Sequence, residues 1–212
     1  MEEKIMQETG EIKKPGKIKK FWRWLWHSDS ILSWIVSLAL AFIVVKFMFF
    51  PLLSFALATP LPLVVVESSS MEHPGSFVGN VIGSENNFQL WWSEKGDWYE
   101  NRDLTKEEAE SWPLKTGFDK GDIMIIYGRD KIPEIGDVIV FNANTQHPII
   151  HRIISVDEST GIIETKGDNN AAQLSVEQGI PEDAIVGKAV ARIPKLGWLK
   201  LVFVEIGNAF SR

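Results

Sequence analysis

A long apolar run near the N-terminus constrains this chain more than any other feature. Residues 31–50 contain a single charged side chain, Lys46, and have about the length that an α-helix needs to cross a bilayer. A cluster of lysines and one arginine precedes the run, and no acid lies between Ile12 and Ser28. Because basic flanks mark the cytoplasmic side, we expect the chain beyond residue 60 to lie outside the cytoplasm.

Two alternatives for this run are less consistent with its flanks. A cleaved signal peptide has a shorter basic region and a shorter apolar stretch. A buried core helix would not explain the basic tail or the tryptophans around it, which are typical of an aromatic belt at the inner interface. We expect Lys46 to extend toward the outer headgroups and Pro51 to end the regular helix. The sequence thus predicts a basic cytoplasmic tail with an interfacial segment over 1–28 and a transmembrane anchor over 29–53.

Composition excludes several classes of function. The 212 residues suffice for one domain plus an anchor. A net charge of −6 argues against nucleic acid as a partner. The chain has no cysteine, which removes disulfides, thiol catalysis and cysteine-ligated metals. Its histidines and carboxylates lack the spacing of metal ligands, so we expect neither a metal nor a cofactor.

The region 60–195 has the pattern of a β domain. Short runs rich in β-branched residues alternate with clusters of Gly, Asp, Pro and Asn, as in strands joined by turns. We therefore predict a mainly β, extracytoplasmic domain built as a compact barrel or folded sheet. The predicted strands cover 63–66, 122–127, 137–141, 149–156, 162–165 and 184–193.

A tryptophan-rich insertion, 76–117, interrupts this pattern. Thr105 and Glu108 have the spacing of a capping box, which predicts a short helix ending near Trp112. The tryptophans suit either the outer membrane interface or a small satellite core. The C-terminal stretch, 196–212, is too short and too charged to span, so we predict that it is membrane-associated.

Two local features are candidates for catalysis. His151 lies inside the apolar run 149–154, a position that on its own is typical of a structural histidine. The serines 68–70 directly follow the predicted strand 63–66, where a serine cluster is usually only a turn. His27 and His147 are expected to be interfacial and solvated, respectively.

Taken together, these features resemble a known family. Ser68-Ser69-Ser70-Met71 resembles the Ser-Gly-Ser-Met box of type I signal peptidases, and Pro148–Arg152 resembles the box that carries the catalytic base. Bacterial members have lysine at the base position, whereas His151 resembles the archaeal and endoplasmic-reticulum branch. The resemblance covers six stretches in the family order: 64–72, 120–123, 136–141, 148–152, 165–170 and 186–189.

The resemblance implies a signal-peptidase-like β fold and a serine endopeptidase that removes signal peptides from preproteins after small residues, at sites of A-x-A type. It implies Ser70 as the nucleophile and His151 as the general base, with the Ser70 N–H and the Ser68 hydroxyl as oxyanion donors. Asp168 matches the last box and becomes the candidate third catalytic residue. The implied location is the cell membrane, and the implied partners are preproteins, the bilayer and the protein-export channel.

The chain departs from the family pattern near the third catalytic residue. A further aspartate usually follows Asp168 by about six positions, but here residues 171–175 hold no acid. Either Asp168 orients His151 alone, or Glu177 or a residue of the insertion does so. Asp168 could equally hold its turn through side-chain hydrogen bonds. A second departure is the extra histidine His73, which we expect to point away from Ser70.

An extended substrate beside Leu63, Val64, Val65 and Val66 would explain the preference for small side chains. Alternate side chains would enter shallow apolar pockets while main-chain hydrogen bonds supply affinity. Two rival functions remain. One is a non-catalytic, membrane-tethered β scaffold of the same fold, and the other is a related serine peptidase with a non-signal substrate.

Overall fold

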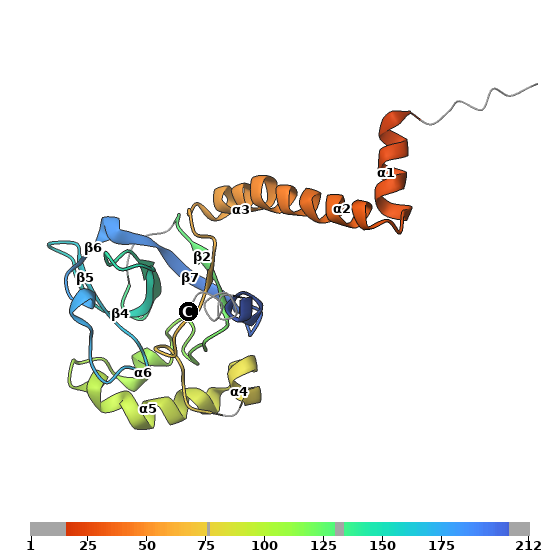
Figure 1. The fold of residues 1–212 in the computed structure, drawn as a ribbon. Helices are drawn as coiled ribbons and strands as arrows, with labels where there is room; N and C mark the ends of the chain where they lie inside the picture. Colours follow the sequence, from red (N-terminus) through yellow and green to blue (C-terminus); the bar gives the residue numbers. More distant parts are fainter. Residues whose placement is uncertain (1–15, 76, 130–133, 204–212) are drawn as a thin grey trace, which may run out of the picture. The chain divides into compact units, whose positions relative to one another are not determined.

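The computed structural model describes residues 16–75, 77–129 and 134–203 (Figure 1). The chain divides into two units, Met1–Pro51 and Leu52–Arg212.

The described part of the N-terminal unit is helical, and the unit ends inside a long apolar helix. Helix α1 covers Lys17–His27, and a second helix begins at Ile31. The Ser30 hydroxyl caps this second helix by accepting a hydrogen bond from the Ser33 N–H at 3.2 Å. The helix runs to Leu57 over 27 residues and is the one described helix that is long and apolar enough to cross a membrane. It consists of α2 (Ile31–Val44), a π-helical turn η1 (Val45–Phe49) and α3 (Phe50–Leu57).

The prediction that Pro51 ends the regular helix is wrong. Helix α3 continues past Pro51 to Leu57. A proline has no N–H to donate, and its ring crowds the carbonyl four residues earlier, here that of Phe47. The widened π turn over Val45–Phe49 lies directly before the proline and accommodates both effects.

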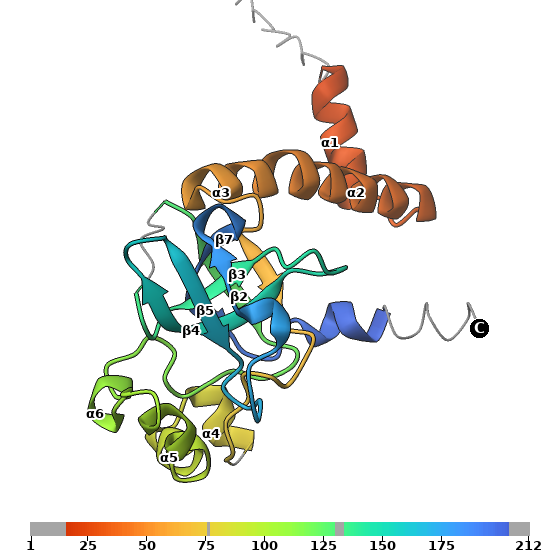
Figure 2. The same ribbon diagram turned by 90° about the vertical axis from the view of Figure 1, so that its left-hand side faces the viewer.

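The second unit is built on one antiparallel sheet of seven strands in the order β1-β2-β7-β3-β4-β5-β6. Figure 2 shows that this sheet is strongly curved. The predicted mainly β fold with an apolar N-terminal helix is confirmed. The strands are β1 Leu63–Val65, β2 Ile123–Tyr127, β3 Val138–Phe141, β4 Ile149–Asp157, β5 Ile162–Lys166, β6 Ile180–Pro181 and β7 Ile185–Ile193.

The central strand β3 is buried on both faces, which explains why its sequence is apolar without alternation. Val138 and Val140 pack into one core cluster with Met71. Ile139 and Phe141 pack into another on the opposite face. The first cluster matters for function, because fully buried Met71 fixes the end of the loop that follows β1.

The insertion forms three helices, α4 (Phe77–Ile82), α5 (Glu85–Glu100) and α6 (Lys106–Ala109). Figures 1 and 2 show them gathered at one end of the sheet. The predicted capping box is present, with the Thr105 hydroxyl accepting from the Glu108 N–H and the Glu108 carboxylate accepting from the Thr105 N–H. Helix α6 is shorter than predicted and ends at Ala109 rather than near Trp112.

The tryptophans of the insertion form a satellite core, the second of the two alternatives for this segment. Trp91, Trp92 and Trp112 are nearly or fully buried. They pack with other apolar side chains of the insertion and with Ile154 of β4. These three side chains are therefore not available to a membrane surface.

The predicted C-terminal segment is only partly described. Residues 198–203 are helical, with Leu199 and Phe203 exposed, and 204–212 lie outside the described residues.

Candidate active site

Ser70 lies in the loop after β1, and two neighbours hold this loop in place. The N–H of Asn169 donates to the Ser70 carbonyl at 2.8 Å, and its side-chain amide donates to the Ser69 carbonyl at 3.1 Å. On the other side, the Phe118 N–H donates to the Met71 carbonyl at 3.0 Å. The Ser70 hydroxyl is thus presented from a loop that is tied down at both ends.

His151 reaches this hydroxyl from strand β4. Its backbone pairs with Ile139 in the sheet, and its side chain is almost fully buried. The Nε2 atom lies 2.8 Å from Ser70 Oγ, although 81 residues separate the two in sequence. The sheet therefore brings together the two residues that the sequence predicts as nucleophile and base.

The other ring nitrogen of His151 is bound by Glu177. The Nδ1 atom is hydrogen-bonded to Glu177 Oε1, and the carboxylate is fully buried in the short 3-10 turn Ser175–Glu177. The same carboxylate accepts from the Leu174 N–H at 2.6 Å and from the Thr165 hydroxyl at 3.3 Å. A carboxylate can only accept hydrogen bonds, so His151 carries its proton on Nδ1 and leaves Nε2 as an acceptor.

This tautomer gives the hydrogen bonds at Ser70 a direction. Ser70 donates to His151 Nε2, and its oxygen accepts from the Ser68 hydroxyl, 3.0 Å away. A serine whose proton already points at an accepting imidazole is arranged for nucleophilic attack.

Asp168 is one of the alternatives for the residue that orients His151, but its carboxylate is bonded to other side chains. Its carboxylate receives two hydrogen bonds from Arg152, from Nε at 2.9 Å and Nη2 at 2.7 Å, and a third from His73 Nε2 at 2.9 Å. The residue before it, Gly167, lies against His151 Nε2, so the chain passes the imidazole there and turns Asp168 away. We therefore correct the prediction that Asp168 orients His151, because Glu177 holds that position.

Arg152 is the centre of a buried structural network. Beyond Asp168, its guanidinium donates to the carbonyls of Pro113, Gly136 and Leu114, at 2.8, 2.8 and 3.2 Å. Burial opposes ionisation of Asp168, but the charge of Arg152 and the hydrogen bonds outweigh it and hold the pKa of Asp168 well below its usual range. The network joins the end of the insertion to the loop that holds Ser70.

His73 belongs to this network and points away from Ser70, in the manner predicted. It stacks on Trp91 with ring centroids 4.4 Å apart. Burial lowers its pKa, against the opposing hydrogen bond and charge of Asp168. Its Nδ1 atom has no hydrogen-bond partner among the described residues, which fits a neutral ring that donates through Nε2.

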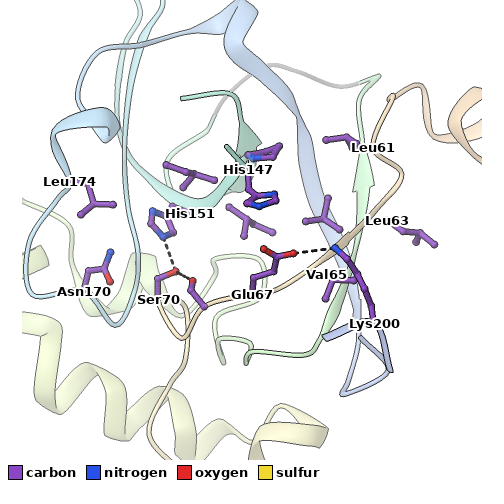
Figure 3. A pocket seen from close by; sticks show the side chains of 15 residues that line it. Leu61, Leu63, Val65, Glu67, Ser70, His147, His151, Asn170, Leu174 and Lys200 are labelled. Carbon is purple, nitrogen blue, oxygen red and sulfur yellow. Dashed lines mark hydrogen bonds and ion pairs between the residues drawn. The ribbon is translucent and has the colours of Figure 1, made fainter. Parts of the chain in front are cut away.

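Ser70 and His151 open into a groove with a volume of about 550 Å³ (Figure 3). One part of its wall is strand β1, and another is the start of β4. The lining residues are Leu61, Leu63, Val64, Val65, Glu67, Ser68, Ser70, His147, Pro148, Ile149, Ile150, His151, Asn170, Leu174 and Lys200.

Three of the four predicted substrate-contacting residues line this groove, and the fourth does not. Leu63, Val64 and Val65 face it, whereas Val66 is only 2% exposed and packs into the core. Val66 lies one residue beyond the strand, at the point where the chain turns inward toward Met71.

Strand β1 is an edge of the sheet, so its outer side is unpaired by any described strand. Val66 exchanges both of its main-chain hydrogen bonds with the β2 side, and Pro62 accepts one from Ile126. Since main-chain groups alternate along a strand, those of Leu63 and Val65 point outward, toward the groove side. This edge is able to pair with an extended peptide.

Metal ligation has no candidate in the described part of the chain, where no group of three or more His, Asp or Glu side chains could hold an ion. His147 is exposed and lines the groove. Glu177 is one of the alternatives that the sequence leaves open for the residue beside His151, and it is the one whose carboxylate is hydrogen-bonded to the imidazole.

Comparison with known proteins gives the same family that the motifs indicated. No family model matches the chain. A segment is 35% identical over 106 residues to a protein of Lachancea thermotolerans, 30% over 105 residues to one of Eremothecium gossypii and 31% over 110 residues to one of Komagataella phaffii. Each relative is named signal peptidase complex catalytic subunit SEC11.

These matches cover 45% of this chain and 63%, 63% and 64% of the three relatives, so the shared part is less than two thirds of each relative. The predicted resemblance is confirmed, because the chain has homologues named as signal peptidase catalytic subunits. The relatives are fungal, and the archaeal part of the predicted branch remains a prediction.

Proposed function

We propose that this chain is a membrane-anchored serine endopeptidase that removes N-terminal signal peptides from exported preproteins. The observation that carries the proposal is the hydrogen-bonded series Ser70–His151–Glu177, placed in a groove beside an open strand edge. The names of the homologues supply the substrate class.

The chemistry follows from the direction of these hydrogen bonds. As Ser70 Oγ attacks the carbonyl carbon of the scissile bond, its proton passes to His151 Nε2. Glu177 stabilises the imidazolium that forms, through the hydrogen bond to Nδ1. His151 then protonates the leaving amine, which becomes the new N-terminus, and a water molecule activated by His151 hydrolyses the acyl-enzyme.

The oxyanion of the tetrahedral intermediate needs donors close to Ser70. The Ser70 N–H is one candidate, and the Ser68 hydroxyl, now 3.0 Å from Ser70 Oγ, is the other. A rotation about the Ser68 Cα–Cβ bond would redirect this hydroxyl from Ser70 to the substrate oxygen. Loss of one such donor typically lowers turnover about 10²–10³-fold.

Substrate binding uses the edge of β1. An extended signal-peptide end would pair with the outward main-chain groups of Leu63 and Val65, and its alternate side chains would face the groove. The wall formed by Ile149 and Ile150 of β4 is apolar and close to Ser70 in the same groove. Such a surface favours uncharged side chains, and the preference for small ones, one and three residues before the cut, is the part that the family resemblance implies.

The apolar helix Ile31–Leu57 supplies the anchor in this proposal. The basic residues before it favour a cytoplasmic N-terminus, and with this orientation the catalytic unit would lie outside, at the cell membrane. Because enzyme and preprotein share one bilayer surface, tethering raises their effective concentration. The relatives are named as subunits of a complex. We therefore propose that this chain also binds partner subunits and the protein-export channel.

The non-catalytic scaffold gains no support from the site. The absence of an acid from residues 171–175 would favour a scaffold, but Glu177 supplies a carboxylate to His151 instead.

Cleavage of a purified preprotein with an A-x-A site, in detergent micelles, tests the proposal. We expect one cut directly after the second small residue, identified by sequencing the new N-terminus. The absence of cleavage by folded protein, or cuts scattered over other sites, would contradict it.

A further inference from the structure

The groove does not stop at the catalytic residues. Figure 3 shows Leu61, Leu63 and Val65 on one side of Ser70 and His151, and Asn170 and Leu174 on the other. The second side belongs to the segment that runs from the end of β5 to the turn holding Glu177.

The two sides of the groove take different parts of a substrate. In the proposed function, residues before the cleaved bond pair with β1, on the side of Leu63 and Val65. The chain must then pass Ser70 and continue on the opposite side, where Asn170 and Leu174 lie. We infer that Asn170 and Leu174 form the subsite for the first residue of the mature protein, and that occupation of this subsite raises turnover. This inference rests on the proposed function.

The chemistry of this subsite favours an apolar residue. Leu174 is 46% exposed, which leaves part of an apolar side chain in the groove to be covered by substrate. Asn170 adds an amide that is able to hydrogen-bond the substrate main chain. An acidic side chain at this position would lose its hydration against Leu174, and the lysine among the described lining residues, Lys200, lies on the other side of the groove.

The same segment holds the Glu177 carboxylate that positions His151. The Leu174 N–H donates to Glu177 Oε2 at 2.6 Å, and the Glu177 N–H donates to the Leu174 carbonyl at 3.0 Å. Gln173 ties the segment to β5 through the carboxylate of Glu164, at 3.0 Å, and the carbonyl of Thr165, at 3.2 Å. A substrate side chain that packs on Leu174 therefore stabilises the turn that orients His151. Such packing should raise kcat more than it changes KM.

The test uses two preproteins that share one signal peptide and differ only in the first mature residue, leucine in one and aspartate in the other. We expect the wild-type protein in detergent to cleave the leucine preprotein about tenfold more efficiently, mainly through kcat. Leu174→Ala keeps the main-chain hydrogen bonds to Glu177, so this variant should cleave the aspartate preprotein within about threefold of the wild-type rate. Its preference for the leucine preprotein over the aspartate preprotein should fall to about twofold. Val176→Ala is the matched control, because Val176 is 38% exposed on the same turn but does not line the groove, and it should keep the tenfold preference.

The possible outcomes separate failure of the subsite from failure of the proposed function. If Leu174→Ala keeps the wild-type preference, or slows both preproteins equally, the subsite is overturned while the proposed function stands. Equal cleavage of the two preproteins by the wild-type protein also overturns the subsite alone. If the folded wild-type protein cleaves neither, the proposed function fails, and the subsite fails with it.

Discussion

Glu177 Oε1 is hydrogen-bonded to Nδ1 of His151, and the whole carboxylate is buried behind the imidazole. The two residues come from a 3-10 turn and from strand β4, with the segment after β5 bridging them. This relationship fixes the tautomer of His151 and so makes Ser70 a hydrogen-bond donor to the base. The predictions below follow from it and from the separate network around Asp168.

Glu177→Gln should lower kcat about 10²–10⁴-fold with little change in KM. The amide keeps the shape of the side chain but can present its N–H₂ to His151, which favours the wrong tautomer and removes the charge that stabilises the imidazolium. Steady-state kinetics on an A-x-A preprotein measures the effect. Glu182→Gln, an exposed site nearby, is the matched control and should behave as the wild type. A loss of kcat below about tenfold in Glu177→Gln would remove Glu177 from the mechanism.

Asp168→Asn should act on stability instead. It leaves the guanidinium of Arg152 buried without its ion-pair partner, a change that typically costs about 3–5 kcal/mol in the free energy of unfolding. Guanidinium unfolding of the detergent-solubilised protein measures this, with the exposed Asp183→Asn as control, expected within about 0.5 kcal/mol of the wild type. An Asp168→Asn protein with normal stability but no activity would return Asp168 to a catalytic role.

The Asp168 contribution also has a defined pH dependence. The pKa of Asp168 is lower in the folded protein than in the unfolded chain, where it is about 3.9. Its stabilisation is thus fully present above about pH 4 and is lost as the pH falls through the folded pKa. The stability difference between the wild type and Asp168→Asn should stay constant from pH 5 to 7 and shrink only in stronger acid. A difference that already changes between pH 5 and 7 would be inconsistent with this assignment.

Lys166→Met tests a lowered pKa on a basic group, for which stability also rises with pH but in the alkaline range. Burial lowers the pKa of Lys166 to about 8, against the attraction of Asp168, while the amine donates to the Gly167 carbonyl at 3.0 Å. The unfolded chain keeps this proton to about pH 10.4, so wild-type stability relative to Lys166→Met should rise between about pH 8 and 10. Thermal unfolding of both proteins across this range measures the change. A difference in melting temperature that stays flat from pH 7 to 10 would contradict it.

Val65→Pro and Val64→Pro separate substrate pairing from sheet pairing. The Val65 N–H points outward from β1, so its loss should leave the sheet intact and raise KM for preprotein by about tenfold, as expected for one main-chain hydrogen bond. The Val64 N–H faces β2, so Val64→Pro should destabilise the fold. An unchanged KM in Val65→Pro would mean that substrate does not pair with this edge.

The sequence predicted the parts of the site that local patterns encode. The apolar run 149–156 predicts strand β4, and the motifs around Ser70 and His151 predict these two residues as nucleophile and base. Glu177 could not be identified in the same way. Its position depends on the path of an irregular segment, and neither periodicity nor spacing determines such a path.

The insertion gives a different lesson. The buried residues Phe88, Trp91 and Trp92 of α5 have helical spacing, but the many acids around them obscured the pattern. A tryptophan of the insertion is buried only if another part of the protein offers an apolar surface to pack against. Here Ile154 of β4 supplies part of that surface, and sequence spacing alone does not show that β4 and α5 meet.

The central claim is that Ser70 and His151 together cleave a signal peptide. We would measure cleavage of a preprotein with an A-x-A site, in liposomes, by the wild type, Ser70→Ala and His151→Ala, with folding of each protein checked by circular dichroism. We predict one cut after the second small residue by the wild type and a loss of at least about 10³-fold in either variant. Cleavage retained by Ser70→Ala, or none by folded wild type, would contradict it.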